Sequence, residues 1–102
     1  MNDNGAEPAL DWIKSLDRED RRAVGADLRT LQYGWPVGMP LCRPMGNGLH
    51  EIRSNLPGGT TARLLFCHHD GQLVILHGFI KKTGKTPKAD LDRALKRKAT
   101  LE

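Results

Sequence analysis

Five charged residues between positions 51 and 82 have the side-chain types that cleavage of an RNA backbone requires. Glu51 and Arg53 stand two residues apart, so on a strand their side chains share one face. Arg63 and the pair Lys81-Lys82 follow in the next extended segments, and all five could meet on one sheet surface. Without a metal, cleavage needs a base for the 2′-hydroxyl, cations for the charge on phosphorus, and an acid for the leaving oxygen. Arginine suits the phosphate because its fork binds two oxygens at once.

Other interpretations of these residues remain open. Glu51 and Arg53 could simply neutralise each other or pair across strands, which is worth less than about 1 kcal/mol when exposed. His77 is expected to be a core or edge histidine, although histidine suits acid–base chemistry near neutral pH. Cys42 and Cys67 lack a metal-ligand spacing and are expected to be buried or half-buried thiols. We therefore expect no metal and no cofactor.

The elements that must position these residues begin with two short helices, which we expect to form an antiparallel hairpin. Pro8 suits the first turn of the first helix, and Asp17 is a good N-cap for the second. The second helix should end at Gly34, because glycine supplies the left-handed cap and Pro36 prevents continuation. Apolar residues at helical spacing mark the buried stripes: Leu10, Ile13 and Leu16 beside Trp12, then Val24, Leu28 and Leu31.

The middle of the chain predicts strands. Residues 34–48 are rich in glycine and proline and predict an irregular crossing segment. After this segment the apolar period changes to two, which predicts three strands at 49–56, 60–68 and 73–80. These strands are expected to form an antiparallel sheet. With the helices, they predict a domain of the α+β class.

The Asp70-Gly71 pair predicts a two-residue hairpin turn between the last two strands. In the register that follows from this turn, Arg63 lies opposite Gly78, which leaves the surface beside the arginine open to a ligand. The same register places Leu64, Phe66, Ile75, His77 and Phe79 together on the other face of the sheet.

The chain ends in a basic helix, for which Thr86 is the expected N-cap and Pro87 the first residue. Its apolar side consists of Leu91, Ala94 and Leu95. The predicted fold is thus a single α+β domain over residues 1–102, with an N-terminal helical hairpin on a small antiparallel sheet and a C-terminal basic helix.

Charge and composition narrow the class of protein. The chain has 102 residues and a net charge of +4, and 38% of its residues are hydrophobic, as in a globular protein. Residues 81–102 hold eight lysines and arginines against three acidic residues, a net charge of +5 that favours a polyanionic partner. The polar first residues are not a secretory signal, and no apolar run reaches the length of a membrane span. We therefore expect a cytoplasmic protein without membrane contact.

Several stretches together resemble a known family. EPALDWIKSLD, GWPVGMPL, GNGLHEIRS, ARLLF and especially LHGFIKKTGKTP are similar to the phage-derived Gp49-like, HigB-type branch of the RelE/ParE toxin superfamily. The similarity runs from Glu7 to about Arg97. It implies a RelE-like fold and a type II toxin that cleaves messenger RNA, often on the ribosome. The implied partner is a helix-turn-helix antitoxin (HigA-like) encoded nearby, and the oligomeric state is left open.

The resemblance also assigns roles to residues. Arg53 and Arg63 would hold the scissile phosphate, Glu51 would act as base, and Lys81 or Lys82 would orient the RNA or assist the leaving group. The implied catalytic set is Glu51, Arg53, Arg63 and Lys82, and the implied RNA-binding set is Lys81, Lys85 and Lys88.

Two departures from the family pattern keep other functions open. Relatives usually begin with a further strand, whereas six residues precede Glu7, and many carry a tyrosine or histidine near the C-terminus that is missing after His77. One alternative is a ParE-like protein that binds DNA gyrase without catalysis; another is a decayed toxin or accessory binding module. A free cationic sheet face favours RNA, and arginines neutralised by packing favour a protein target.

Overall fold

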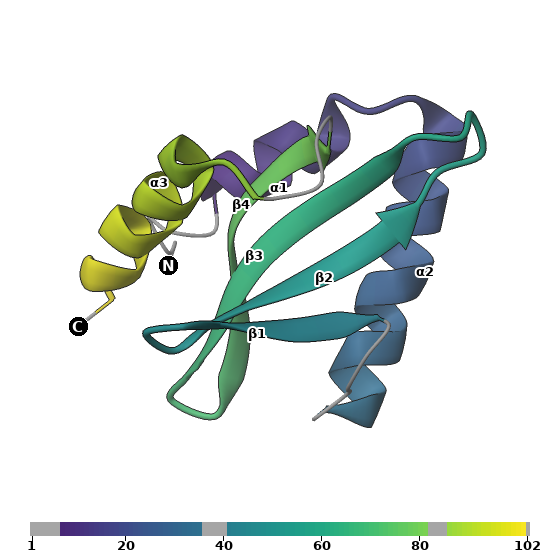
Figure 1. Ribbon diagram of the computed structural model, residues 1–102. Coiled ribbons are helices and arrows are strands. Elements are labelled where there is room, and N and C mark those ends of the chain that lie inside the picture. The colour runs from purple at the N-terminus through teal and green to yellow at the C-terminus, as the bar shows by residue number, and fades with distance from the viewer. Residues whose placement is uncertain (1–6, 36–40, 82–85, 102) are drawn as a thin grey trace.

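The computed structural model describes residues 7–35, 41–81 and 86–101, which form helices on both faces of one antiparallel sheet (Figure 1). The helices are α1 (Glu7–Lys14), α2 (Arg18–Gly34) and α3 (Lys88–Ala99), and the strands are β1 (Cys42–Gly46), β2 (Leu49–Asn55), β3 (Thr61–His69) and β4 (Gln72–Lys81). The strand order in the sheet is β1-β2-β3-β4. The predicted α+β class, with two N-terminal helices, an antiparallel sheet and a C-terminal helix, is confirmed.

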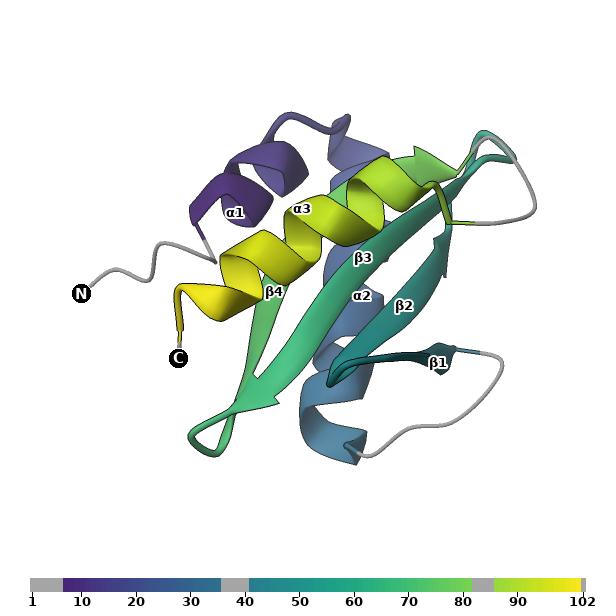
Figure 2. The ribbon, with the colours of Figure 1, turned by 60° about the vertical axis from the view of Figure 1, so that its left-hand side comes forward.

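The helices divide between the two faces of the sheet. On one face α1 packs against β4 and α2 packs against β2, while α3 packs against β3 and β4 on the other (Figure 2). The central strand β3 is therefore covered on both sides, and every residue from Ala62 to Cys67 is buried. On its own face α3 leaves β1 uncovered (Figure 2).

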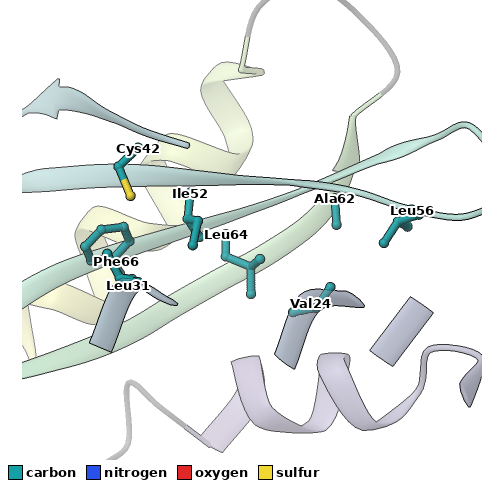
Figure 3. Packing of buried hydrophobic residues seen from close by; sticks show 8 residues of the cluster. All are labelled: Val24, Leu31, Cys42, Ile52, Leu56, Ala62, Leu64 and Phe66. Carbon is teal, nitrogen blue, oxygen red and sulfur yellow. The ribbon is translucent and has the colours of Figure 1, made fainter. Parts of the chain in front are cut away.

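The main core lies between α2 and the sheet. Val24 and Leu31 of α2 face the buried side chains of the strands (Figure 3). The sheet residues of this cluster are Cys42, Ile52, Leu56, Ala62, Leu64 and Phe66. A second cluster under α3 contains Leu49, Leu65, Cys67, Val74, Leu76 and Ala94. The two cysteines thus lie on opposite faces as buried residues that form no disulfide, as the sequence predicted.

The first helix is rotated relative to its predicted stripe. Leu10 was expected in the core but is 49% exposed, whereas Ala9 is 1% exposed. The cause is the close contact between Trp12 and Gly78 of β4, where a Cβ atom would lie 2.5 Å from Trp12 Cε3. This contact turns the face of Ala9 and Trp12 toward the sheet and leaves Leu10 outside.

The predicted irregular segment contains a strand that the sequence analysis missed. β1 pairs with β2 through the turn Asn47-Gly48, whose φ angles of 54° and 78° are those of a type I′ turn. Pro44 is tolerated in β1 because this strand lies at the edge of the sheet, where no neighbour needs its missing N–H.

The turn at Asp70-Gly71 is confirmed, with φ angles of 51° and 78°, but the predicted register holds for only part of the hairpin. Phe66 pairs with Ile75 as expected, and a register shift follows between Leu65 and Phe66. Leu65 then pairs with His77, so that Leu76 is an additional residue in β4, which is a β-bulge.

Because of the bulge, the neighbours of Arg63 differ from those predicted. Arg63 pairs with Phe79, and Gly78 pairs with Leu64 on the face of α1. His77 and Phe79 accordingly lie on the face of α3, not on the face of Phe66 as predicted, because one extra residue exchanges the faces of all later side chains.

The last helix also differs from its prediction at the N-terminus. α3 begins at Lys88 with Pro87 as N-cap, and no side chain caps it. Thr86, the expected cap, directs its hydroxyl elsewhere. No helix in the described ranges is long and apolar enough to cross a membrane.

Candidate functional site

Four charged residues of β1, β2 and β3 share the face of the sheet on which α3 lies. Arg43 is directly opposite Glu51, and Arg53 is directly opposite Arg63. Their neighbour Ser54 points to the other face, where its hydroxyl donates to Asp27 Oδ2 of α2 at 2.6 Å. We call Arg43, Glu51, Arg53 and Arg63 the arginine face. Three arginines surround one carboxylate there, a surplus of positive charge that suits an anionic ligand.

At the centre of the arginine face lies a buried ion pair. Arg63 is 1% exposed and Glu51 is 2% exposed. Arg63 Nη1 donates to Glu51 Oε1, and the Thr86 hydroxyl donates to Glu51 Oε2 at 2.5 Å. Both carboxylate oxygens thus accept hydrogen bonds, which makes the ionised form tolerable away from water. The structure brings Glu51 and Arg63 into direct contact, as the sequence had suggested for one sheet surface.

The rest of the Arg63 guanidinium group has no partner among the described residues. Its Nε and Nη2 atoms are buried and make no hydrogen bond. These two N–H groups form the side edge of the guanidinium group, which donates two parallel hydrogen bonds to a carboxylate or phosphate. Buried donors are rarely left unpaired, so this edge is a candidate anion-binding group.

Arg53 adds a second cation opposite Arg63. It is partly exposed beside the residue that precedes β1, where Arg53 N donates to Leu41 O at 2.9 Å. Its side chain lines a surface hollow together with Asp27, Leu41 and Asn55. Like charges directly opposite on neighbouring strands repel each other, and an anion bound between them removes this repulsion.

The candidate lysines are only partly within the described residues. Lys81 ends β4, where it pairs with Thr61, and its side chain is not described. Lys82 and Lys85 lie outside the described residues. Lys88 is exposed at the start of α3.

His77 is buried, as expected for a core histidine, and both ring nitrogens are engaged by α3. Its Nε2 lies 2.6 Å from Asp90 Oδ1, and Arg97 Nη1 lies 3.2 Å from its Nδ1. Because arginine only donates, Nδ1 is the acceptor and the proton is assigned to Nε2, which donates to Asp90. Arg97 also donates to the carbonyl of Leu76 in the bulge, at 2.8 Å. These bonds fasten α3 to β4.

The other described histidines lie away from the arginine face. His50 packs between Trp35 and Phe66, with ring centroids 5.0 Å and 5.5 Å away. Burial, and secondarily the nearby His68, lower the pKa of His50 and favour its neutral form. His68 is exposed and stacks on Trp35, and His69 lies 3.3 Å from Asp70. No group of three metal-ligating side chains is found within the described part of the chain.

Sequence reasoning missed two residues of this site. Arg43 was overlooked because its segment was expected to be irregular, although the Asn47-Gly48 pair is a hairpin signal that predicts β1. Thr86 was interpreted as a helix cap, and no sequence signal distinguishes capping from its bond to Glu51.

A comparison with family models finds a match over most of the chain. The model described as phage derived protein Gp49-like (DUF891) matches residues 11–99, which include all four residues of the arginine face and Thr86. No curated protein matches the chain.

Proposed function

Because the chain belongs to the Gp49-like family of phage-derived proteins, a RelE/HigB-like toxin family, we propose that it is the toxin of a type II toxin-antitoxin system that cleaves messenger RNA. Cleavage inhibits translation and growth, and a helix-turn-helix antitoxin (HigA-like) encoded nearby neutralises the toxin. The reaction proceeds in the cytoplasm, on the ribosome, without a metal.

One observation carries this proposal: Arg63, whose buried side edge makes no hydrogen bond within the described chain, pairs with Arg53 on the neighbouring strand. A phosphodiester bound between the two arginines receives two parallel hydrogen bonds from Arg63 and a further positive charge from Arg53. Fixed donors of this kind stabilise the charge that develops on phosphorus more than the charge of the ground state, which is the condition for catalysis.

The roles of the other candidates follow from their contacts. Glu51 accepts hydrogen bonds at both oxygens, so we propose that it orients Arg63 and does not act as general base. The proton of the attacking 2′-hydroxyl then passes to solvent water. Lys82 assists the leaving oxygen. Lys81, Lys85 and Lys88 contact RNA phosphates on either side of the cleaved bond, consistent with the positive charge of residues 81–102.

A second function is favoured by one specific observation. Arg63 is neutralised by Glu51 and buried, and this packing is the feature that we associated with a protein target. The second candidate is therefore a ParE-like toxin that binds DNA gyrase without cleaving RNA.

Primer extension on messenger RNA after induction separates the two candidates. Wild-type protein should cut inside translated codons, and Arg53→Gln should weaken the cuts at least about 10-fold, since removal of one oxyanion donor commonly lowers kcat by about 10²–10³. Arg63→Lys keeps a positive charge beside Glu51 but removes the two-pronged guanidinium group. This variant should also weaken the cuts.

Arg29→Gln is the matched control, because Arg29 is an exposed arginine of α2 beyond the opposite face of the sheet. It should cut like the wild type. Intact messages together with growth arrest would point to the gyrase-type candidate, and intact messages with normal growth would point to a decayed toxin.

A further inference from the structure

We propose that Thr86 is a positioning residue that keeps the side edge of Arg63 free for phosphate, by holding Glu51 to a single hydrogen bond with that arginine. The expected effect of Thr86 on RNA cleavage rests on the proposed function. Its geometric part, the control of Arg63 by Thr86 through Glu51, can be tested without any cleavage.

The position of Thr86 is unusual for a threonine before a helix. It stands two residues before Lys88, the first residue of α3, and so directly precedes the N-cap Pro87. Here α3 has no side-chain cap, and the Thr86 hydroxyl donates to Glu51 Oε2 at 2.5 Å. The contact joins residues 35 positions apart in the sequence. The hydroxyl therefore serves the buried carboxylate and not its own helix.

The carboxylate needs this second donor because it is buried. Glu51 is 2% exposed, so water does not readily supply a partner for Oε2. An unpaired buried acceptor costs about 1–3 kcal/mol. Without Thr86, Oε2 can be satisfied by a turn of the carboxylate toward the Arg63 guanidinium group, which already holds Oε1 through Nη1.

That turn would change what Arg63 offers to a ligand. Carboxylate and guanidinium groups readily form a pair with two parallel hydrogen bonds. In such a pair Glu51 would also occupy Nη2, one of the two nitrogens that are now without a partner among the described residues. Thr86 prevents this by holding Oε2, which leaves Nε and Nη2 for the two oxygens of a phosphodiester.

The attachment of α3 does not depend on Thr86 alone. Asp90 bonds His77, Arg97 bonds the Leu76 carbonyl, and Ala94 is buried in the cluster under α3. Loss of the Thr86 hydroxyl should therefore leave α3 docked on the sheet, which separates a positioning role from a merely structural one.

The test compares Thr86→Val, which removes the hydroxyl at nearly constant shape, with Thr86→Ser, which retains it. Thr30→Val is the control, because Thr30 is an exposed threonine of α2. The first readout is the NMR signal of the Arg63 Nε–H group during titration with a single-stranded DNA oligonucleotide, which presents phosphodiesters but has no 2′-hydroxyl to react. The second is the kcat for cleavage of RNA.

We expect the Arg63 signal to respond to the oligonucleotide in the wild type, Thr86→Ser and Thr30→Val, and the response to be lost or strongly weakened in Thr86→Val. The kcat of Thr86→Val should fall by about 10-fold or more, approaching the loss of one oxyanion donor, and Thr86→Ser should rescue it. An unchanged Arg63 response in folded Thr86→Val would overturn the inference. A wild type that does not cleave RNA, but whose Arg63 signal depends on Thr86 as described, would refute the proposed function and support the positioning role.

Discussion

Arg63 combines burial with incomplete hydrogen bonding. Its side chain is 1% exposed, one nitrogen is bonded to Glu51, and two nitrogens have no partner within the described chain. A residue with a purely structural role would be expected to satisfy these donors or to be replaced by an apolar side chain, because a buried ion pair adds little net stability. The two unpaired nitrogens are explained if this edge binds an anion.

A paired replacement separates stability from function at this residue. Glu51→Leu alone should lower the free energy of unfolding by about 3–5 kcal/mol, because it leaves a charged arginine buried without its partner. The double variant Glu51→Leu, Arg63→Met should be as stable as the wild type or more stable, since apolar residues often replace buried ion pairs without loss. Urea denaturation followed by circular dichroism measures both.

The double variant should nevertheless have no toxic activity, because the phosphate-binding edge is gone. The interpretation of Arg63 as a functional residue would be wrong if this variant were stable and still arrested growth. A double variant as unstable as Glu51→Leu would show that the pair is needed for folding.

At the scale of elements, the sequence predicted well what depends on local signals. α2 begins and ends where predicted, but Asp17 makes no side-chain capping bond, and Gly34 is the last residue of the helix and not a left-handed cap. The turn at Asp70-Gly71 is found as predicted from its turn residues. The bulge in β4 and the rotation of α1 were not predictable, because both depend on contacts between distant segments. Arg97 of α3 binds the carbonyl that the bulge exposes, and Trp12 covers Gly78.

The same distinction holds for the candidate site. The alternation within β2 placed Glu51 and Arg53 on one face, and the register brings Arg63 beside them. Spacing alone gave no indication that Glu51 and Arg63 are buried, because burial depends on how α3 and Thr86 close over the strand.

The contact between Trp12 and Gly78 gives a prediction for the packing of α1. Gly78→Ala should lower the free energy of unfolding by about 1–3 kcal/mol, as overpacking does in a close-packed core. The added Cβ would lie 2.5 Å from Trp12 Cε3, so the ring must move. Urea denaturation measures the change.

Gly25→Ala in α2 is the matched control. No atom lies within 4 Å of a Cβ at Gly25, and alanine in a helix is more stable than glycine by about 0.5–1 kcal/mol. This variant should therefore be more stable than the wild type. Equal effects of the two substitutions would show that the Trp12 contact does not control the packing of α1.

At the scale of the whole molecule, the two faces of the sheet differ in character. The larger apolar cluster lies between the sheet and the helices α1 and α2. On the side of α3 the sheet has a smaller apolar cluster and, beside it, the four residues of the arginine face. The exposed positions of α3 add Lys88, Arg93 and Lys96 against Asp92. The side of the molecule that holds the proposed phosphate site is thus the side on which positive charge is concentrated.

This distribution of charge predicts how RNA binding depends on salt. Each phosphate contact to a single strand contributes about −0.7 to the slope of log K against log salt concentration, because binding releases condensed counterions. Arg53→Gln should therefore make the slope less steep by about 0.7, whereas Arg29→Gln on α2 should leave it unchanged. The measurement is the affinity for a single-stranded oligonucleotide at several salt concentrations. Equal slopes for all three proteins would place the RNA elsewhere, because an arginine that contacts a phosphate must contribute to counterion release.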